Sequence, residues 1–252
     1  MMRDWVQGLL SSHEYEVHCT NSEGQTPLHL ACWRGHLAIV RSLLCEFDAD
    51  VYSRDNDNDT PLNTAALGGQ TTVVRALITE FGCSPQVRGF EGRTLLHHAC
   101  DGGHLELVDK LVSRLECDPM AVSDTGNTPL HIAAAAGQKE VARKLIIRYR
   151  CPVDCRNKQN NTPLHSAALV GHTDVVCALI TEFGCSPQVR GFEGRTLLHY
   201  ACDGGHLELV DKLVSEFEWP QLGIWKRFTR SLLWVDRCSL SWASGRGLLE
   251  VY

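Results

Sequence analysis

The apolar residues of this chain fall into pairs of short runs at helical spacing, and a polar loop separates each pair from the next. In one such pair, Leu96, Ala99 and Cys100 lie on one face of a short helix, and the two glycines at 102–103 end that helix. A second helix is then marked by Leu107, Val108, Leu111 and Val112. The pattern therefore predicts units of two antiparallel helices and a loop.

A threonine marks the start of the first helix in each unit and recurs every 34 residues without insertion or deletion: Thr26, Thr60, Thr94, Thr128, Thr162 and Thr196. Thr-Pro, the usual pair, is typical of a helix start, because the hydroxyl can accept from a free amide and proline loses no hydrogen bond in the first turn. Two residues earlier stand Gly24, Asn58, Gly92, Gly126, Asn160 and Gly194. Glycine and asparagine best tolerate a positive φ, which predicts a tight turn at each loop tip.

The repeated segment Thr-Pro-Leu-His, followed by Ala and then by Gly-His, resembles the ankyrin repeat over residues 21–220. It is complete at 26–29, 128–131 and 162–165 and varied at 60–63, 94–97 and 196–199. The resemblance implies an all-α solenoid, an ankyrin-type repeat array of helix-turn-helix units joined by hairpin-like loops. One such unit cannot bury its own apolar faces, so stability must come from stacking along the array.

This register predicts six repeats, at residues 21–54, 55–88, 89–122, 123–156, 157–190 and 191–220. It also extends backwards and predicts an N-terminal half repeat over residues 1–20 that holds only a second helix. Residues 76–113 and 178–215 differ only at His98 and Tyr200, at an offset of three units. We interpret this as a block duplication, so matching features in the two copies are one observation rather than two.

The repeat pattern stops after Phe217, and residues 221–252 form a non-repeat C-terminal tail of different composition. Three apolar residues recur every four positions from Ile224 to Leu232, with three basic residues between them, as in a basic amphipathic helix. Three interpretations stay open: a helix that covers the last repeat, a helix over 221–235 that binds a membrane surface or a partner, and an end that does not fold with the array.

The formal net charge of −6 argues against nucleic acid as a partner, because an acidic body repels phosphate backbones. No apolar stretch has the length of a signal peptide or a membrane span. Most of the 12 cysteines recur at repeat positions, where equivalent atoms of stacked units should lie about 8–10 Å apart, too far for a disulfide. We therefore expect buried free thiols and a cytoplasmic, reducing location, with the close pair Cys151 and Cys155 left open.

Nine of the 12 histidines share two repeat positions: His29, His97, His131, His165 and His199 at one, and His36, His104, His172 and His206 at the other. The repeat itself accounts for them, and the resemblance implies that the first set ties neighbouring loops together by hydrogen bonds. No spacing typical of a metal, nucleotide or hydrolase site occurs. We expect no metal, no cofactor and no enzymatic activity.

The resemblance places partner binding on the loop tips and on the exposed side of each first helix. Large apolar groups occur there at positions that the scaffold does not need, and exposed aromatic and arginine side chains are typical interface anchors. An alternative is that the two tip phenylalanines fold back onto the adjacent loop. The candidate protein-binding residues are Trp33, Arg34, Leu67, Phe90, Arg93, Asp101, Leu169, Val170, Phe192, Arg195 and Asp203.

The sequence thus predicts a monomeric, non-catalytic protein–protein interaction scaffold whose partner it does not name. It would bind through its loop tips and the concave face formed by its first helices. Two alternatives stay open. One is a membrane-peripheral protein anchored by the basic amphipathic tail. The other is the recognition fragment of a larger signalling or ubiquitin-ligase adaptor protein.

Overall fold

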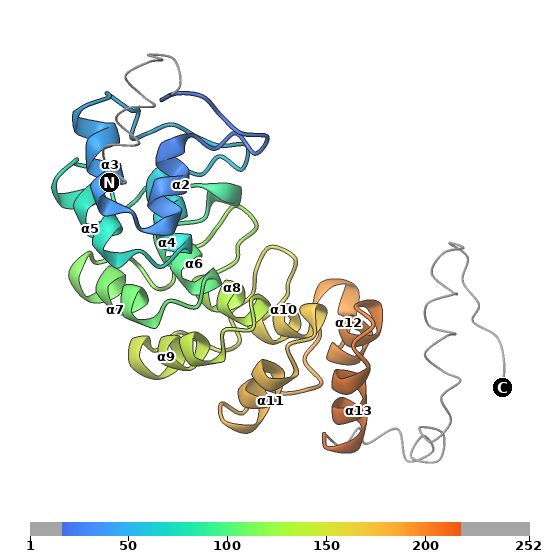
Figure 1. The fold of residues 1–252 in the computed structure, drawn as a ribbon. Coiled ribbons are helices and arrows are strands. Elements are labelled where there is room, and N and C mark those ends of the chain that lie inside the picture. The colour runs from blue at the N-terminus through green and yellow to red at the C-terminus, as the bar shows by residue number, and fades with distance from the viewer. Residues whose placement is uncertain (1–16, 218–252) are drawn as a thin grey trace.

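The structure, a computed structural model of the chain, describes residues 17–217. Pairs of antiparallel helices follow one another along a curved array, and long loops project from the same side of successive pairs (Figure 1). The all-α solenoid expected from the sequence is confirmed. The predicted tail over 221–252, and the predicted half repeat over 1–20 except for residues 17–20, lie outside the described part of the chain.

Each unit contributes a first and a second helix, at the positions that the threonine spacing predicts. The first helices are α2 (Pro27–Arg34), α4 (Pro61–Leu67), α6 (Leu95–Asp101), α8 (Pro129–Ala135), α10 (Pro163–Val170) and α12 (Leu197–Asp203). The second helices are α3 (Leu37–Cys45), α5 (Thr71–Thr79), α7 (Leu105–Arg114), α9 (Lys139–Tyr149), α11 (Thr173–Thr181) and α13 (Leu207–Ser215).

A threonine and the residue three positions after it, histidine in five units and Asn63 in the second, start the first helices. The backbone N–H of Thr26 donates to Nδ1 of His29 across 3.1 Å, and the Thr26 hydroxyl lies 2.9 Å from the same nitrogen. Because Nδ1 accepts, the ring proton is on Nε2, which donates to the carbonyl oxygen of Asp59 in the next unit (3.1 Å). Helices α6 and α12 begin in the same way without proline, since the threonine caps them.

The loop tips turn through left-handed backbone, as predicted. Positive φ angles occur at Gly24, Asn58, Gly92, Gly126, Asn160 and Gly194. Backbone hydrogen bonds then join one tip to the next: the N–H of Asn56 donates to the carbonyl oxygen of Glu23 (3.0 Å), and that of Asp124 to Glu91 (2.7 Å). The tips therefore form a continuous row along one edge of the array.

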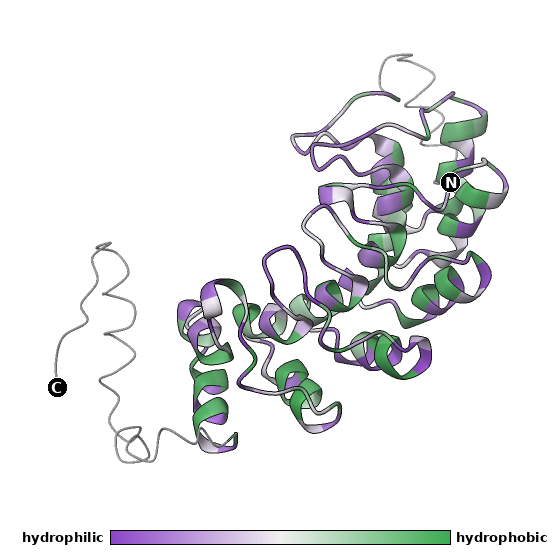
Figure 2. Cartoon of the chain, turned by 180° about the vertical axis from the view of Figure 1, so that it is seen from behind, coloured by the Kyte–Doolittle hydropathy of each residue, from purple (hydrophilic) through white to green (hydrophobic). Residues whose placement is uncertain are grey.

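Buried leucine, valine, alanine and cysteine fill the space between the helices. The apolar side chains form one cluster over α2–α9 and a second over α10–α13, which also includes Ala134 of α8, and Ile146 packs against both. Each fully buried leucine contributes about 1.5–3 kcal/mol to stability. Hydrophilic residues instead predominate on the projecting loops (Figure 2).

The cysteines are free thiols throughout the described residues, including Cys151 and Cys155. Most of those that recur at repeat positions are buried, as predicted: Cys32, Cys83, Cys100, Cys117 and Cys151. Two are only partly buried, Cys185 and Cys202, and both belong to the last described unit or to the loop that precedes it. A residue there has no further described unit stacked on it.

Candidate protein-binding surface

The candidate surface consists of the loop tips and the C-terminal ends of the first helices. Among the predicted apolar residues, Trp33 is 45% exposed, Phe90 36% and Phe192 46%, and Leu169 and Val170 are similarly open. Leu67 is half-buried and offers less surface. Both tip phenylalanines thus keep more than a third of their surface in solvent instead of being covered by the adjacent loop.

Trp33 lies at the end of α2 and is held against the next unit. Its carbonyl oxygen accepts a hydrogen bond from Nε2 of Gln70 (3.0 Å). A Cβ on Gly68 would come within 2.8 Å of the indole ring and 2.4 Å of the Trp33 carbonyl oxygen, so only glycine permits this approach. The Arg34 guanidinium carbon sits 4.6 Å from the centre of the indole ring, a cation–π contact that leaves both groups at the surface.

The third unit holds a second anchor around Phe90. The guanidinium of Arg93 lies over the Phe90 ring, 4.9 Å from its centre. Its Nη1 donates to Asp101 Oδ2 across 3.2 Å, and Nη2 lies 3.4 Å from Glu91. Only 18% of the Arg93 side chain is exposed, and its Nε is buried without a hydrogen-bond partner. The arginine therefore joins the loop tip to the end of α6 and fixes the ring beside it.

The sixth unit repeats this arrangement with one change. Arg195 Nη1 donates to Asp203 Oδ2, again across 3.2 Å, and Phe192 occupies the loop tip. The Arg195 guanidinium also lies 6.0 Å from the ring of Tyr200, the residue that differs between the two copies. The structure thus pairs Arg with Asp in both copies, whereas the arginine lies over the tip phenylalanine in the third unit and near Tyr200 in the sixth.

Leu169 and Val170 form an exposed apolar step at the end of α10. The carbonyl oxygen of Leu169 accepts from Nε2 of His206 in the next unit (2.9 Å). In the same way, His104 donates to the carbonyl oxygen of Leu67 (2.8 Å). Two of the second set of repeated histidines, His104 and His206, therefore hold the ends of α4 and α10, which keeps the exposed side chains there in fixed positions.

One exposed residue of this surface was missed by the sequence analysis. Leu30 on α2 is 40% exposed, although the equivalent His98 and Tyr200 are buried. Each unit has a different residue at this position. The repeat pattern therefore could not indicate that the side chain is exposed in the first unit.

The ionisable groups of the first helices are arranged for structure. Burial lowers the pKa of His97 and of His165 to about 4, so both rings are neutral donors to the neighbouring loop. Burial also raises the pKa of the Cys83 thiol to about 11.

Within residues 17–217 no group of three or more metal-ligating side chains comes together. None of the described helices has the length and apolar character needed to span a bilayer.

A family model described as ankyrin repeats matches the chain in three copies, at residues 2–89, 81–153 and 144–221. The chain belongs to the ankyrin repeat family. Ankyrin repeats are generally protein–protein interaction modules and are typically non-catalytic. No curated protein matches this ankyrin array in a sequence comparison.

Proposed function

We propose that this ankyrin array is a non-catalytic scaffold that binds a protein partner through its loop tips and the concave face of its first helices. The observation that carries the proposal is the set of large apolar side chains left exposed on this one surface. They are Trp33, Phe90, Leu169, Val170 and Phe192.

Fixed aromatic side chains are efficient anchors because little conformational entropy is lost when a partner covers them. Phe90 and Trp33 each contact an arginine, and Asp101 holds one of those arginines in place. A partner that docks here would desolvate apolar rings without first having to order them. We therefore expect a largely preformed interface.

The test begins with a photoreactive amino acid at position 195, followed by mass spectrometric identification of the crosslinked protein. The dissociation constant of that purified protein is then compared for the parent chain and for the double variant Phe90→Ser, Phe192→Ser. We expect at least a tenfold loss of affinity with unchanged circular dichroism. The matched control is Ile147→Ser, which removes an apolar side chain of α9 that is 63% exposed, more than either phenylalanine. Equal loss in the control would refute the proposed surface.

We further propose that the chain acts as a monomer in the cytoplasm and uses neither nucleic acid nor a cofactor. Its net charge of −6 and its free thiols support this. Light scattering at micromolar concentration should give the monomer mass of 28.0 kDa. The rival proposal, membrane anchoring through 221–235, predicts that deleting residues 221–252 abolishes liposome binding, whereas the scaffold proposal predicts that the parent chain does not bind liposomes.

A further inference from the structure

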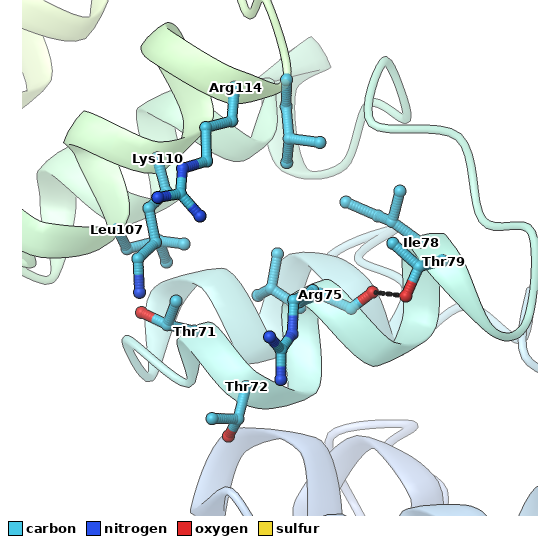
Figure 3. Close-up of a pocket in the computed structure, with 10 residues that line it drawn as sticks. Thr71, Thr72, Arg75, Ile78, Thr79, Leu107, Lys110 and Arg114 are labelled. Carbon is cyan, nitrogen blue, oxygen red and sulfur yellow. Dashed lines mark hydrogen bonds between the residues drawn. The ribbon is translucent and has the colours of Figure 1, made fainter.

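A pocket opens between the second helices α5 and α7 (Figure 3). These helices lie on the side of the array away from the projecting loops (Figure 1). Its volume is about 160 Å³. Val74, Ile78, Leu107 and Leu115 supply apolar walls. The α5–α7 contact is less extensive than the contacts of α3 with α5 and of α7 with α9, which leaves this space open.

Three cations surround the pocket. Arg75 projects from α5, whereas Lys110 and Arg114 project from α7 (Figure 3). Lys110 pairs with Glu106 of its own helix across 2.5 Å. Arg75 and Arg114 make no ion pair with any carboxylate among the described residues, although both are exposed.

We call the contact between two successive second helices a seam. The neighbouring seams differ from that of α5 and α7, because in each of them a carboxylate of one helix pairs with a cation of the other. Arg41 of α3 binds Glu80 at the end of α5 across 2.6 Å. Lys144 of α9 binds Asp109 of α7, also across 2.6 Å. Arg143 of α9 likewise reaches Glu182 at the end of α11 (2.7 Å). The α5–α7 seam has the cations without the bridging acid.

The duplicated block supplies an internal comparison. The seam between α11 and α13 keeps the apolar wall, with Val176, Ile180 and Leu209 at the corresponding positions. Its charges are different, since Cys177 stands where α5 has Arg75, and Glu216 stands where α7 has Arg114. The cationic rim is thus a property of one seam and not a requirement of the repeat.

We propose that the α5–α7 pocket binds an acidic peptide segment that carries one large apolar side chain. An apolar cavity of about 150 Å³ accepts a benzene-sized group, so the pocket fits one phenylalanine or leucine side chain. Carboxylates on either side of that residue would then pair with Arg75 and Arg114, which form no ion pair with a described carboxylate. The pocket is a different binding surface from the loop tips. The proposal for one surface can therefore be refuted without affecting the other.

A peptide fits this site better than a bare anion or an anionic membrane. Inorganic phosphate would leave the apolar walls in water. A membrane would also meet Glu106 on α7 and Glu140 on α9, whose side chains are 77% and 63% exposed and repel anionic lipid. A short segment can contact the cations and avoid these carboxylates.

The test uses the full chain and the fluorescein-labelled peptide Glu-Glu-Phe-Glu-Glu, with fluorescence anisotropy as the readout. We expect binding that weakens with salt, because the contacts are charged. The analogues Gln-Gln-Phe-Gln-Gln and Glu-Glu-Ser-Glu-Glu should each bind at least tenfold more weakly. This pair separates the contribution of the carboxylates from that of the apolar side chain.

The decisive variant is Arg114→Glu, which introduces the residue that stands at the equivalent position 216, directly after the second copy of the block. It should weaken peptide binding at least tenfold. Lys158→Glu makes the same change of charge at a loop tip and should alter binding less than twofold. Equal loss in both variants, or no peptide binding by the parent chain, overturns the proposal. Binding of phosphatidylserine vesicles or of inorganic phosphate that depends on Arg114, in place of peptide binding, also overturns it.

Discussion

His98 Nε2 lies 3.3 Å from Asp59 Oδ1, and both side chains are buried between the second and third units. Three units later the same two positions hold Tyr200 and Asn161, and the phenol donates to Asn161 Oδ1 across 2.5 Å. The single difference inside the duplicated block is therefore matched by a difference in the residue that it contacts. Asp59 and Asn161 also each accept the backbone N–H of the tip phenylalanine in the next loop.

Replacing His98 by Phe should cost more stability than replacing Tyr200 by Phe. The first change leaves the buried carboxylate of Asp59 beside an apolar ring, at a cost of about 3 kcal/mol. The second removes the neutral hydrogen bonds of the phenol with Asn161 and with the N–H of Phe192, together worth about 1–2 kcal/mol. Urea denaturation measures both. Adding Asp59→Asn to the His98→Phe variant should recover more than half of its loss, because the buried charge is gone. No recovery would show that the charge does not cause the loss.

Asn63 stands at the position where the other five units have histidine, and its Nδ2 is buried without a hydrogen-bond partner. In the copy, His165 Nε2 reaches the carbonyl oxygen of Val189 across 3.2 Å. Asn63→His should restore the equivalent bond to Val87 and raise the free energy of unfolding by about 1 kcal/mol. The reciprocal His165→Asn should lower it by a similar amount. Destabilisation by Asn63→His would mean that the third loop leaves no room for the ring.

Stability should fall as the pH is lowered from about 6.5 to about 4. The pKa of His97 and that of His165 are lowered to about 4 by burial, against an ordinary value of 6.5, and burial also lowers those of His29 and His131. In this window the unfolded chain binds protons that the folded chain does not, so protonation favours unfolding, by about 1.4 kcal/mol for each unit of pKa difference at each group. Above pH 6.5 these groups add no slope.

Thermal unfolding followed by circular dichroism across this pH range would measure that slope. The variant His97→Asn removes one titrating group and keeps a side chain that the second unit already tolerates at this position. Its stability should change less steeply with pH than that of the parent chain. Parallel curves for the two proteins would contradict the assignment of the slope to these histidines.

Thiol alkylation should divide the cysteines by position. Cys45 is exposed on α3, whereas Cys32 and Cys100 are buried and burial raises the pKa of both thiols, which disfavours the reactive thiolate. Iodoacetamide at neutral pH should therefore modify Cys45 within minutes and the other two only after unfolding. Mass spectrometry of tryptic peptides reads this directly. Rapid modification of Cys100 in the folded chain would contradict the stacking of the units around it.

The sequence by itself determined the helix boundaries and the turns, because these depend on neighbours within a few residues. Thr94 starts α6 although Leu95 replaces proline, since a capping side chain and the following residues suffice. Asn58 and Asn160 adopt the positive φ that their residue type permits. Because the sequence repeats every 34 residues, the same local features could be predicted for every unit of the array.

Only the tertiary structure decided which side chains meet between units. The pairing of His98 with Asp59, the cation–π contact of Arg93 with Phe90 and the open seam beside Arg75 depend on distances between elements, which periodicity does not contain. Identical local sequences can also face different neighbours, as Arg93 and Arg195 do. Stacking sets those neighbours, and so it decides which groups are buried with a partner and which are left at the surface for another molecule.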